Sequence, residues 1–146
     1  MSKVLCVVLS LAFLPGQPVW HTNMEEAKQL AVHDHKLILL NFSGSDWCGP
    51  CIELRKEVLD DPAFLSLADS TLVLVNADFP RMKKNQLLKE IQQANDKLAD
   101  QYNPQGKFPL TLLLDSSGKV IYQWEGNPGL NASAFAAAIR SAAGKR

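Results

Sequence analysis

A short apolar strand leads into a cysteine pair at residues 37–51, which read LILLNFSGSDWCGPC. The run 37–42 is almost continuously apolar, as expected of a strand that is covered on both faces. Residues 43–46 (SGSD) then break the strand. Pro50 suits the first turn of a helix, because its missing N–H would have no partner there. We therefore expect strand, loop and helix in that order, with the helix reaching about Leu59.

Cys48 and Cys51 are separated by two residues, so a disulfide can close between them with little backbone movement. The unpaired N–H groups and partial positive charge of a helix start stabilise a thiolate. They lower the pKa of the first cysteine below the free value of about 8.5. Cys48 is therefore the predicted nucleophile. Cys51, one turn into the helix, is placed to attack the mixed disulfide that Cys48 forms with a substrate, and no bound cofactor is predicted because the dithiol itself carries the electrons.

The rest of the chain alternates between helix and strand signals. A capping-box pattern at Thr22 and Glu25 opens the first helix, and residues 115–118 (DSSG) form a hairpin turn signature between two antiparallel strands. The expected helices are 23–34, 50–59, 62–67, 83–102 and 131–143, and the expected strands are 37–42, 71–77, 110–114 and 120–124. This order predicts an α/β domain with a central mixed β-sheet flanked by helices on both faces.

Length and charge balance narrow the class of function. The chain has 146 residues, 15 basic and 15 acidic side chains and 47% hydrophobic residues, which describes one globular domain. A formal net charge of zero argues against nucleic acid or an anionic membrane surface as the main partner, because both favour a basic excess. At this length a core buries roughly two-thirds of the surface of the unfolded chain, so stability needs no disulfide or metal. The cysteine pair therefore points to chemistry.

The N-terminus has the pattern of an export signal. A single lysine precedes the apolar run 4–14 (VLCVVLSLAFL), and residues 15–18 (PGQP) end it. A spanning helix needs about 20 apolar residues, so no stable membrane span is predicted. We interpret residues 1–18 as a signal peptide and residues 19–146 as the folded domain of a periplasmic or otherwise exported protein. The alternative is a buried first strand of a cytoplasmic domain, and Cys6 is interpreted as an apolar filler.

The chain resembles the thioredoxin family at its cysteine motif, Trp47-Cys48-Gly49-Pro50-Cys51. The order of elements over residues 37–144 is similar to the thioredoxin fold, and the segments 41–46 and 75–81 resemble exported thioredoxin-like proteins of bacteria. The resemblance implies a thiol:disulfide oxidoreductase that reduces or exchanges the disulfides of protein substrates. It also implies a monomer that an electron-donating reductase recharges.

The resemblance further implies a set of substrate-binding residues. Pro109 takes the place of the family's cis-proline, and a cis X-Pro bond costs only about 0.5 to 1 kcal/mol. The backbone of Phe108 would pair with an extended substrate peptide, and Gly126 would bring backbone close to the dithiol. The predicted substrate-binding set is Trp47, Gly49, Pro50, Phe108, Pro109 and Gly126. The alternatives are a packing role for Trp47 and a plain turn at Gly126.

Two positions depart from the thioredoxin pattern. With a one-residue shift, Asn41 stands where the family has a buried aspartate that helps to move the proton of the resolving thiol. Leu74 stands at the place of the lysine that pairs with this aspartate. A buried ion pair is thus replaced by an amide and a hydrocarbon. We expect proton transfer through water or through Asp46 instead.

Gly49 and Pro50 place no charge between the two cysteines. A histidine there would stabilise the reduced form and make the pair more oxidising, so we expect a reductant or a mild exchanger. A disulfide isomerase is the near alternative, although isomerases commonly add a dimerisation domain. A peptide-binding or chaperone-like module that keeps a structural disulfide is the alternative from another class.

Some remaining side chains are interpreted as structural. A Cys-x-x-Cys pair can form half of a zinc site, but the histidines at 21, 33 and 35 lack the paired spacing of such a site, so no metal is predicted. Trp20 and Trp124 are interpreted as packing residues. The basic cluster Arg81, Lys83 and Lys84 is interpreted as a hydrated helix start, with docking of an acidic partner as the alternative.

Overall fold

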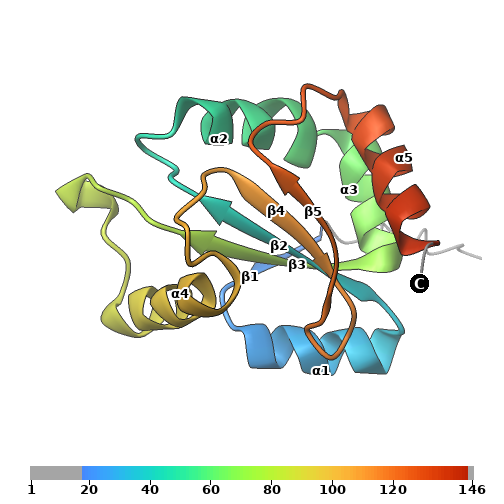
Figure 1. Ribbon diagram of the computed structural model, residues 1–146, viewed down its shortest axis with the longest axis horizontal. Helices are drawn as coiled ribbons and strands as arrows, with labels where there is room; N and C mark the ends of the chain where they lie inside the picture. The colour runs from blue at the N-terminus through green and yellow to red at the C-terminus, as the bar shows by residue number, and fades with distance from the viewer. Residues whose placement is uncertain (1–17, 145–146) are drawn as a thin grey trace, which may run out of the picture.

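A five-stranded mixed sheet forms the centre of the computed structural model, which describes residues 18–144 (Figure 1). The strands are β1 (Trp20–His21), β2 (Leu37–Ser43), β3 (Leu72–Asp78), β4 (Leu110–Leu114) and β5 (Val120–Glu125). In the sheet order β1-β3-β2-β4-β5, strands β1 and β2 run parallel to β3, whereas β4 runs antiparallel to both β2 and β5. The predicted antiparallel hairpin is confirmed.

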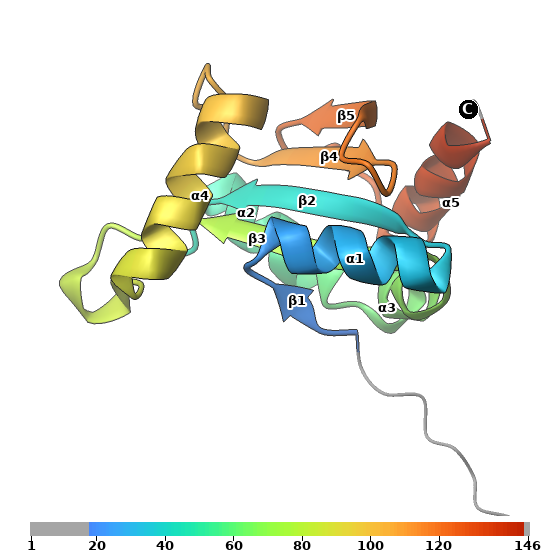
Figure 2. The same ribbon diagram turned by 90° about the horizontal axis from the view of Figure 1, so that it is seen from below.

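Helices cover both faces of this sheet, as the sequence predicts. They are α1 (Met24–Asp34), α2 (Gly49–Leu54), α3 (Pro62–Thr71), α4 (Lys89–Tyr102) and α5 (Ala132–Ala143). A π-helical turn, η1 (Arg55–Leu59), continues α2, and a short 3-10 turn, η2 (Lys83–Asn85), precedes α4. Figure 2 shows α1 in front of the sheet with α2 and α3 behind it. No helix within residues 18–144 has the length and apolar character to cross a membrane.

Strand β2 separates two hydrophobic cores, and all seven of its residues are buried. Leu37 and Leu39 face the core that α2, η1, α3 and α5 cover, whereas Ile38, Leu40 and Phe42 face the core that α1 and α4 cover. Successive side chains of a strand point to opposite faces, so a strand buried on both sides needs apolar residues at nearly every position. This burial explains the continuous apolar run and fixes the position of the loop that follows it.

The N-terminal part of the fold differs from the sequence prediction in two details. The side chain of Asn23, not Thr22, caps α1, because its Oδ1 accepts hydrogen bonds from the N–H groups of Glu25 and Glu26 at 3.0 and 3.3 Å. The two-residue strand β1 was not predicted, since so short a segment carries no periodic signal. Apart from Pro18, the predicted signal peptide and Cys6 lie outside the described residues.

The prediction of one helix over residues 83–102 is wrong in its first part. Residues 83–85 form η2, and Leu88 has ψ 143°, so the α-helix begins only at Lys89. The predicted end of the preceding short helix is also wrong, because α3 continues to Thr71, whose Oγ1 donates to the Leu67 carbonyl at 2.7 Å. Strand β3 consequently begins at Leu72.

Candidate active site

Four loops meet at one end of the sheet, around the cysteine pair (Figure 1). The loop 44–48 follows the end of β2, and the loop 79–88 follows the end of the parallel neighbour β3. Because β4 runs antiparallel to β2, its first residue lies at this same end, with Pro109 directly before it. Strand β5 ends beside the start of β4 and leads to Gly126. The topology thus brings together the predicted site residues from distant parts of the sequence.

The cysteine pair is closed as a disulfide, with an S–S distance of 2.04 Å and Cα atoms 5.2 Å apart. Cys48 is the N-cap residue of α2, and its Sγ accepts a hydrogen bond from the Cys51 N–H at 3.3 Å. The same N–H would stabilise a thiolate on Cys48 after reduction. Cys48 is 5% exposed and Cys51 3%, while Gly49 and Pro50 between them are exposed. A partner must therefore approach over these two residues.

An aromatic cluster forms one wall beside Cys48. The indole N–H of Trp47 donates to the Phe79 carbonyl at 2.8 Å. The ring of Phe108 meets Trp47 and Phe79 edge-on, with centroids 5.4 and 5.5 Å apart. Such edge contacts add about 0.5–1.5 kcal/mol to the burial of the rings. Trp47 is half-buried, so it packs against the loop after β3 and also reaches the surface next to the disulfide.

The Phe108–Pro109 peptide bond is cis, as the resemblance implies. The N–H of Gly126 donates to the Pro109 carbonyl at 2.8 Å, with Gly126 at a φ of +72° that favours glycine. This hydrogen bond joins the segments before β4 and after β5. The structure thus places Phe108, Pro109 and Gly126 together, where β4 begins beside the end of β5.

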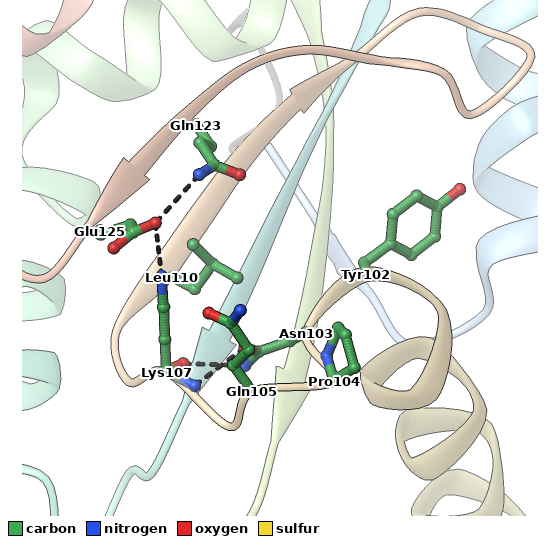
Figure 3. Close-up of a pocket in the computed structure, with 8 residues that line it drawn as sticks. All are labelled: Tyr102, Asn103, Pro104, Gln105, Lys107, Leu110, Gln123 and Glu125. Carbon is green, nitrogen blue, oxygen red and sulfur yellow. Dashed lines mark hydrogen bonds and ion pairs between the residues drawn. The ribbon is translucent and has the colours of Figure 1, made fainter.

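A group of hydrogen-bonded polar side chains lies beside the start of β4, around Lys107 and Leu110 (Figure 3). Asn103 is buried, and its side chain both donates to the Lys107 carbonyl and accepts from the Lys107 N–H, each at 2.8 Å. The Lys107 ammonium in turn contacts the Glu125 carboxylate at 2.7 Å. These residues line a cavity of ≈290 Å³. The polar side chains that line this cavity are hydrogen-bonded to one another. We therefore interpret them as a structural support for the cis-proline segment.

A second cavity, of ≈430 Å³, lies beside Cys51, the predicted resolving cysteine. Its wall includes Asn41 and Asn76, which stand opposite each other on β2 and β3. The Asn41 Nδ2 donates to the Asn76 Oδ1 at 3.3 Å, and the Thr111 hydroxyl donates to the Asn41 Oδ1 at 3.1 Å. Asn41 is thus a buried amide whose nitrogen and oxygen each form a hydrogen bond, and it lines the same cavity as Cys51.

The two positions that depart from the thioredoxin pattern, Asn41 and Leu74, do not face each other in the sheet. Leu74 stands opposite Leu39 in the strand register and packs in the core beneath α2, whereas Asn76 stands opposite Asn41. The carboxylate that lines the second cavity is that of Asp60, and it pairs with Arg55 at 2.7 Å.

Asp46 fastens the loop 79–88 to the loop 44–48. Its carboxylate accepts the backbone N–H groups of Arg81 and Met82, each at 2.9 Å, and the Asn85 side-chain amide at 3.0 Å. The hydrogen bond from the Arg81 N–H is the main reason that the pKa of Asp46 falls below its ordinary value of 3.8. Asp46 also does not line the cavity beside Cys51. In this structure Asp46 holds the neighbouring loop, and proton transfer through water or through Asp46 stays a prediction.

We expect this clamp to open in acid. A folded-state pKa below the unfolded value gives stability that is present above the unfolded pKa and is lost as pH falls through the folded pKa. The amide resonances of Arg81 and Met82 should therefore shift together as pH falls from 5 to 2 in an NMR titration. In Asp46→Asn, which cannot ionise, both resonances should be displaced at pH 5 and should no longer titrate. Flat wild-type resonances over this range would contradict the assignment.

The three histidines lie in or next to β1 and α1, and two of them are close to carboxylates there. His21 lies 3.9 Å from Glu26, and His33 contacts Asp34 at 2.6 Å. His35 is the C-cap residue of α1 at φ 55°. Within residues 18–144 no three His, Cys, Asp or Glu side chains gather in a way that could hold a metal ion. Trp20 packs against the core beneath the Arg55 guanidinium, and Trp124 meets Phe135 edge-on, so their predicted packing roles are confirmed.

Sequence reasoning missed several residues that shape the site. Asp78, at the end of β3, accepts hydrogen bonds from the N–H and hydroxyl of Ser45 at 2.9 and 2.5 Å, and so adds a second tie between the two loops. Asn103, which directly follows the helix predicted over residues 83–102, was also not predicted to support the site. The Asn-Pro-x-Gly run at 103–106 was a visible signal for a side chain that folds back onto its own turn.

Comparisons with known proteins agree with this geometry. A family model described as thioredoxin-like matches residues 19–116. The "Disulfide bond reductase DsbH" of Chlamydia pneumoniae is 36% identical over 117 residues, which cover 80% of this chain and 68% of that protein. A solved structure named "DsbH Oxidoreductase" superimposes with a TM-score of 0.78 and 32% identity, covering 100% of this chain and 96% of the other.

A further relative is longer than this chain. The "Thioredoxin-related protein DsbJ" of Chlamydia pneumoniae is 33% identical over 105 residues, which cover 72% of this chain and 29% of that protein. This chain therefore spans less than a third of the length of that relative. The match of the family model over residues 19–116 covers more than half of the chain, and it includes the cysteine motif and cis-Pro109. The chain belongs to the thioredoxin-like family.

Proposed function

We propose that this protein is a thiol:disulfide oxidoreductase that works as a protein-disulfide reductase. The observation that carries the proposal is the Cys48–Cys51 disulfide at the start of α2, beside Trp47 and the cis-Pro109 segment. The pair can open to a dithiol and close again, and the exposed Gly49 and Pro50 leave a path for a partner sulfur. No bound cofactor is needed, because the two sulfurs carry both electrons.

The reaction starts from the reduced dithiol. The Cys48 thiolate attacks one sulfur of a client disulfide, so that the client S–S bond breaks, a mixed disulfide forms and the first client thiolate leaves. The Cys51 thiolate then attacks the Cys48 sulfur, which closes the internal disulfide and releases the second client thiolate. Two electrons pass to the client, and a dithiol reductase must return two electrons to Cys48 and Cys51 before the next turn.

Reduction is the favoured direction because the residues between the cysteines carry no charge. Gly49 and Pro50 give a thiolate on Cys48 no cationic partner that would stabilise the reduced form. A relative with 36% identity is named a disulfide bond reductase, which supports the same direction. Phe108 and Pro109 would hold an extended client segment by backbone hydrogen bonds, with Trp47 covering its side chains.

The proposal places this protein outside the cytoplasm. Support comes from the apolar run at residues 4–14 and its Pro-Gly breaker, which have the pattern of a cleaved signal. The folded domain would act as a monomer on protein clients and would need a membrane-embedded or soluble reductase to recharge it. The N-terminal residue of the mature protein, determined by mass spectrometry, would test export, and cleavage before about Val19 is expected.

Equilibration with glutathione buffers tests the direction of electron flow. We expect a midpoint potential below about −150 mV, because the step from a thioredoxin-like potential to a strong oxidant is about 150 mV, or roughly 7 kcal/mol for two electrons. Distant charges are unlikely to supply that much. The ratio of dithiol to disulfide at each buffer composition can be read by alkylation and mass spectrometry. A midpoint above this value would contradict a reducing role.

A further inference from the structure

The loop after β3 and the first residue of α4 are rich in basic residues, although the formal net charge of the whole chain is zero. Residues 81–89 read RMKKNQLLK, with four basic residues and no acidic one. All four basic residues are exposed, and none of them takes part in an ion pair among the described residues, 18–144. Met82 and Leu88 in the same segment are 48% and 70% exposed. Figure 1 shows this segment projecting from the end of the sheet. We call residues 81–89 the basic loop.

The basic loop is tied to the candidate active site at its first residues. The guanidinium of Arg81 lies 3.7 Å from the centroid of the ring of Trp47, which directly precedes Cys48 in the chain. Asp46 holds the backbone of Arg81 and Met82. The nearby carboxylates of Asp46 and Asp78 already accept hydrogen bonds from the protein, so they do not neutralise the outward-facing cations by direct contact. The cations are therefore displayed on a loop that packs against Trp47, the residue before Cys48.

The opposite side of the site has different chemistry. In the sheet order, β3 lies on one side of β2 and β5 lies on the other. Beyond the end of β5, the Asn127 side chain donates to the Glu53 carboxylate of α2 at 3.2 Å. A segment lying across Cys48 thus meets cations on the β3 side and a carboxylate on the β5 side. This polarity favours a client whose negative charge lies on the β3 side.

We propose that the basic loop is a docking surface for client proteins that carry aspartate or glutamate close to their disulfide. The proposal rests on the reductase function proposed above. A guanidinium stacked on an indole is fixed in plane and keeps donors free for a carboxylate. Lys83 and Lys84 add long-range attraction, which raises the rate of encounter with an acidic client.

Three synthetic peptides test this surface. Each carries one internal disulfide in the same sequence, flanked by two glutamates, two glutamines or two lysines. We expect kcat/KM at low salt to be about tenfold higher for the glutamate peptide than for the glutamine peptide, and lowest for the lysine peptide. The preference should shrink towards unity at about 0.5 M salt, because the exposed charges are screened.

Charge-reversed variants locate the effect. In Lys83→Glu/Lys84→Glu the preference for the glutamate peptide should disappear or invert. The control Lys97→Glu/Lys119→Glu makes the same change in net charge at exposed positions outside the basic loop and should keep the preference. Equal rates for the three wild-type reactions, or equal loss of preference in both variants, would overturn the docking surface alone. Failure of the wild type to reduce even the glutamine peptide would overturn the proposed reductase function as well.

Discussion

Cys51→Ser is expected to trap this protein on its clients as stable mixed disulfides. Cys48 would still attack a client disulfide, but no second sulfur would then be present to release it. Turnover should fall on the order of 10³-fold or more, because the two sulfurs act as one unit. Non-reducing electrophoresis of the variant with a disulfide-bearing client should show a covalent adduct that dithiothreitol dissolves. The effect should be large because Cys51 is the residue whose sulfur forms the disulfide with Cys48 in the closed state.

Cys48→Ser provides the matched control for this trap. It removes the predicted nucleophile, the sulfur at the N-cap of α2, so the variant should form almost no adduct and should reduce nothing. If Cys51→Ser forms no adduct, the protein is a passive peptide-binding module whose disulfide is structural. If Cys48→Ser forms adducts as readily as Cys51→Ser, the order of attack is the reverse of the one proposed.

Gly44→Ala is expected to damage the aromatic wall without touching either cysteine. A Cβ at this buried position would lie 2.6 Å from Cζ2 and Nε1 of Trp47, so the indole would have to move. That movement breaks the hydrogen bond to the Phe79 carbonyl and the contact with Arg81. Overpacking of this kind costs about 1–3 kcal/mol of unfolding free energy.

Urea unfolding and client reduction measure this damage together. We expect the unfolding midpoint to fall and kcat/KM for a protein disulfide to drop at least about tenfold, since each 1.4 kcal/mol of lost binding is a factor of ten. Gly144→Ala is the control, because its Cβ would meet only carbonyl oxygens at an ordinary 3.7 Å. Its stability should stay within about 0.5 kcal/mol of wild type. An unchanged Gly44→Ala protein would mean that the indole position does not matter.

The strands of the central sheet and the cysteine pair could be predicted from the sequence because their signals are local. Strand β2 is apolar at nearly every position since both its faces are buried, and the helix after it is marked by Pro50 at its first turn. The cis bond at Pro109 could be anticipated only from the family resemblance, because no local pattern distinguishes it from other prolines.

The features that the sequence did not reveal depend on contacts between distant segments. The helix predicted to begin at Lys83 begins only at Lys89. The loop before it is held by Asp46, which lies 35 residues before Arg81 in the chain. The pairing of Asn41 with Asn76 follows from the register of β2 on β3, which a sequence pattern does not specify to one residue. The hydrogen bonds of Asp46 to the loop after β3 likewise could not be read from the sequence.

The amide-lined cavity beside Cys51 links the chemistry to the acidity of the surroundings. In the second step Cys51 must lose its proton, and neighbouring Asn41 and Asn76 are amides that cannot accept one, while the Asp60 carboxylate in the same wall is paired with Arg55. Water entering from outside would carry that proton away. The release of the reduced client would therefore become faster as the pH rises and slower as the pH falls. Because Asn41 stands where the family has a buried aspartate, the rate of the reaction cycle would depend on the pH of the compartment in which the protein works.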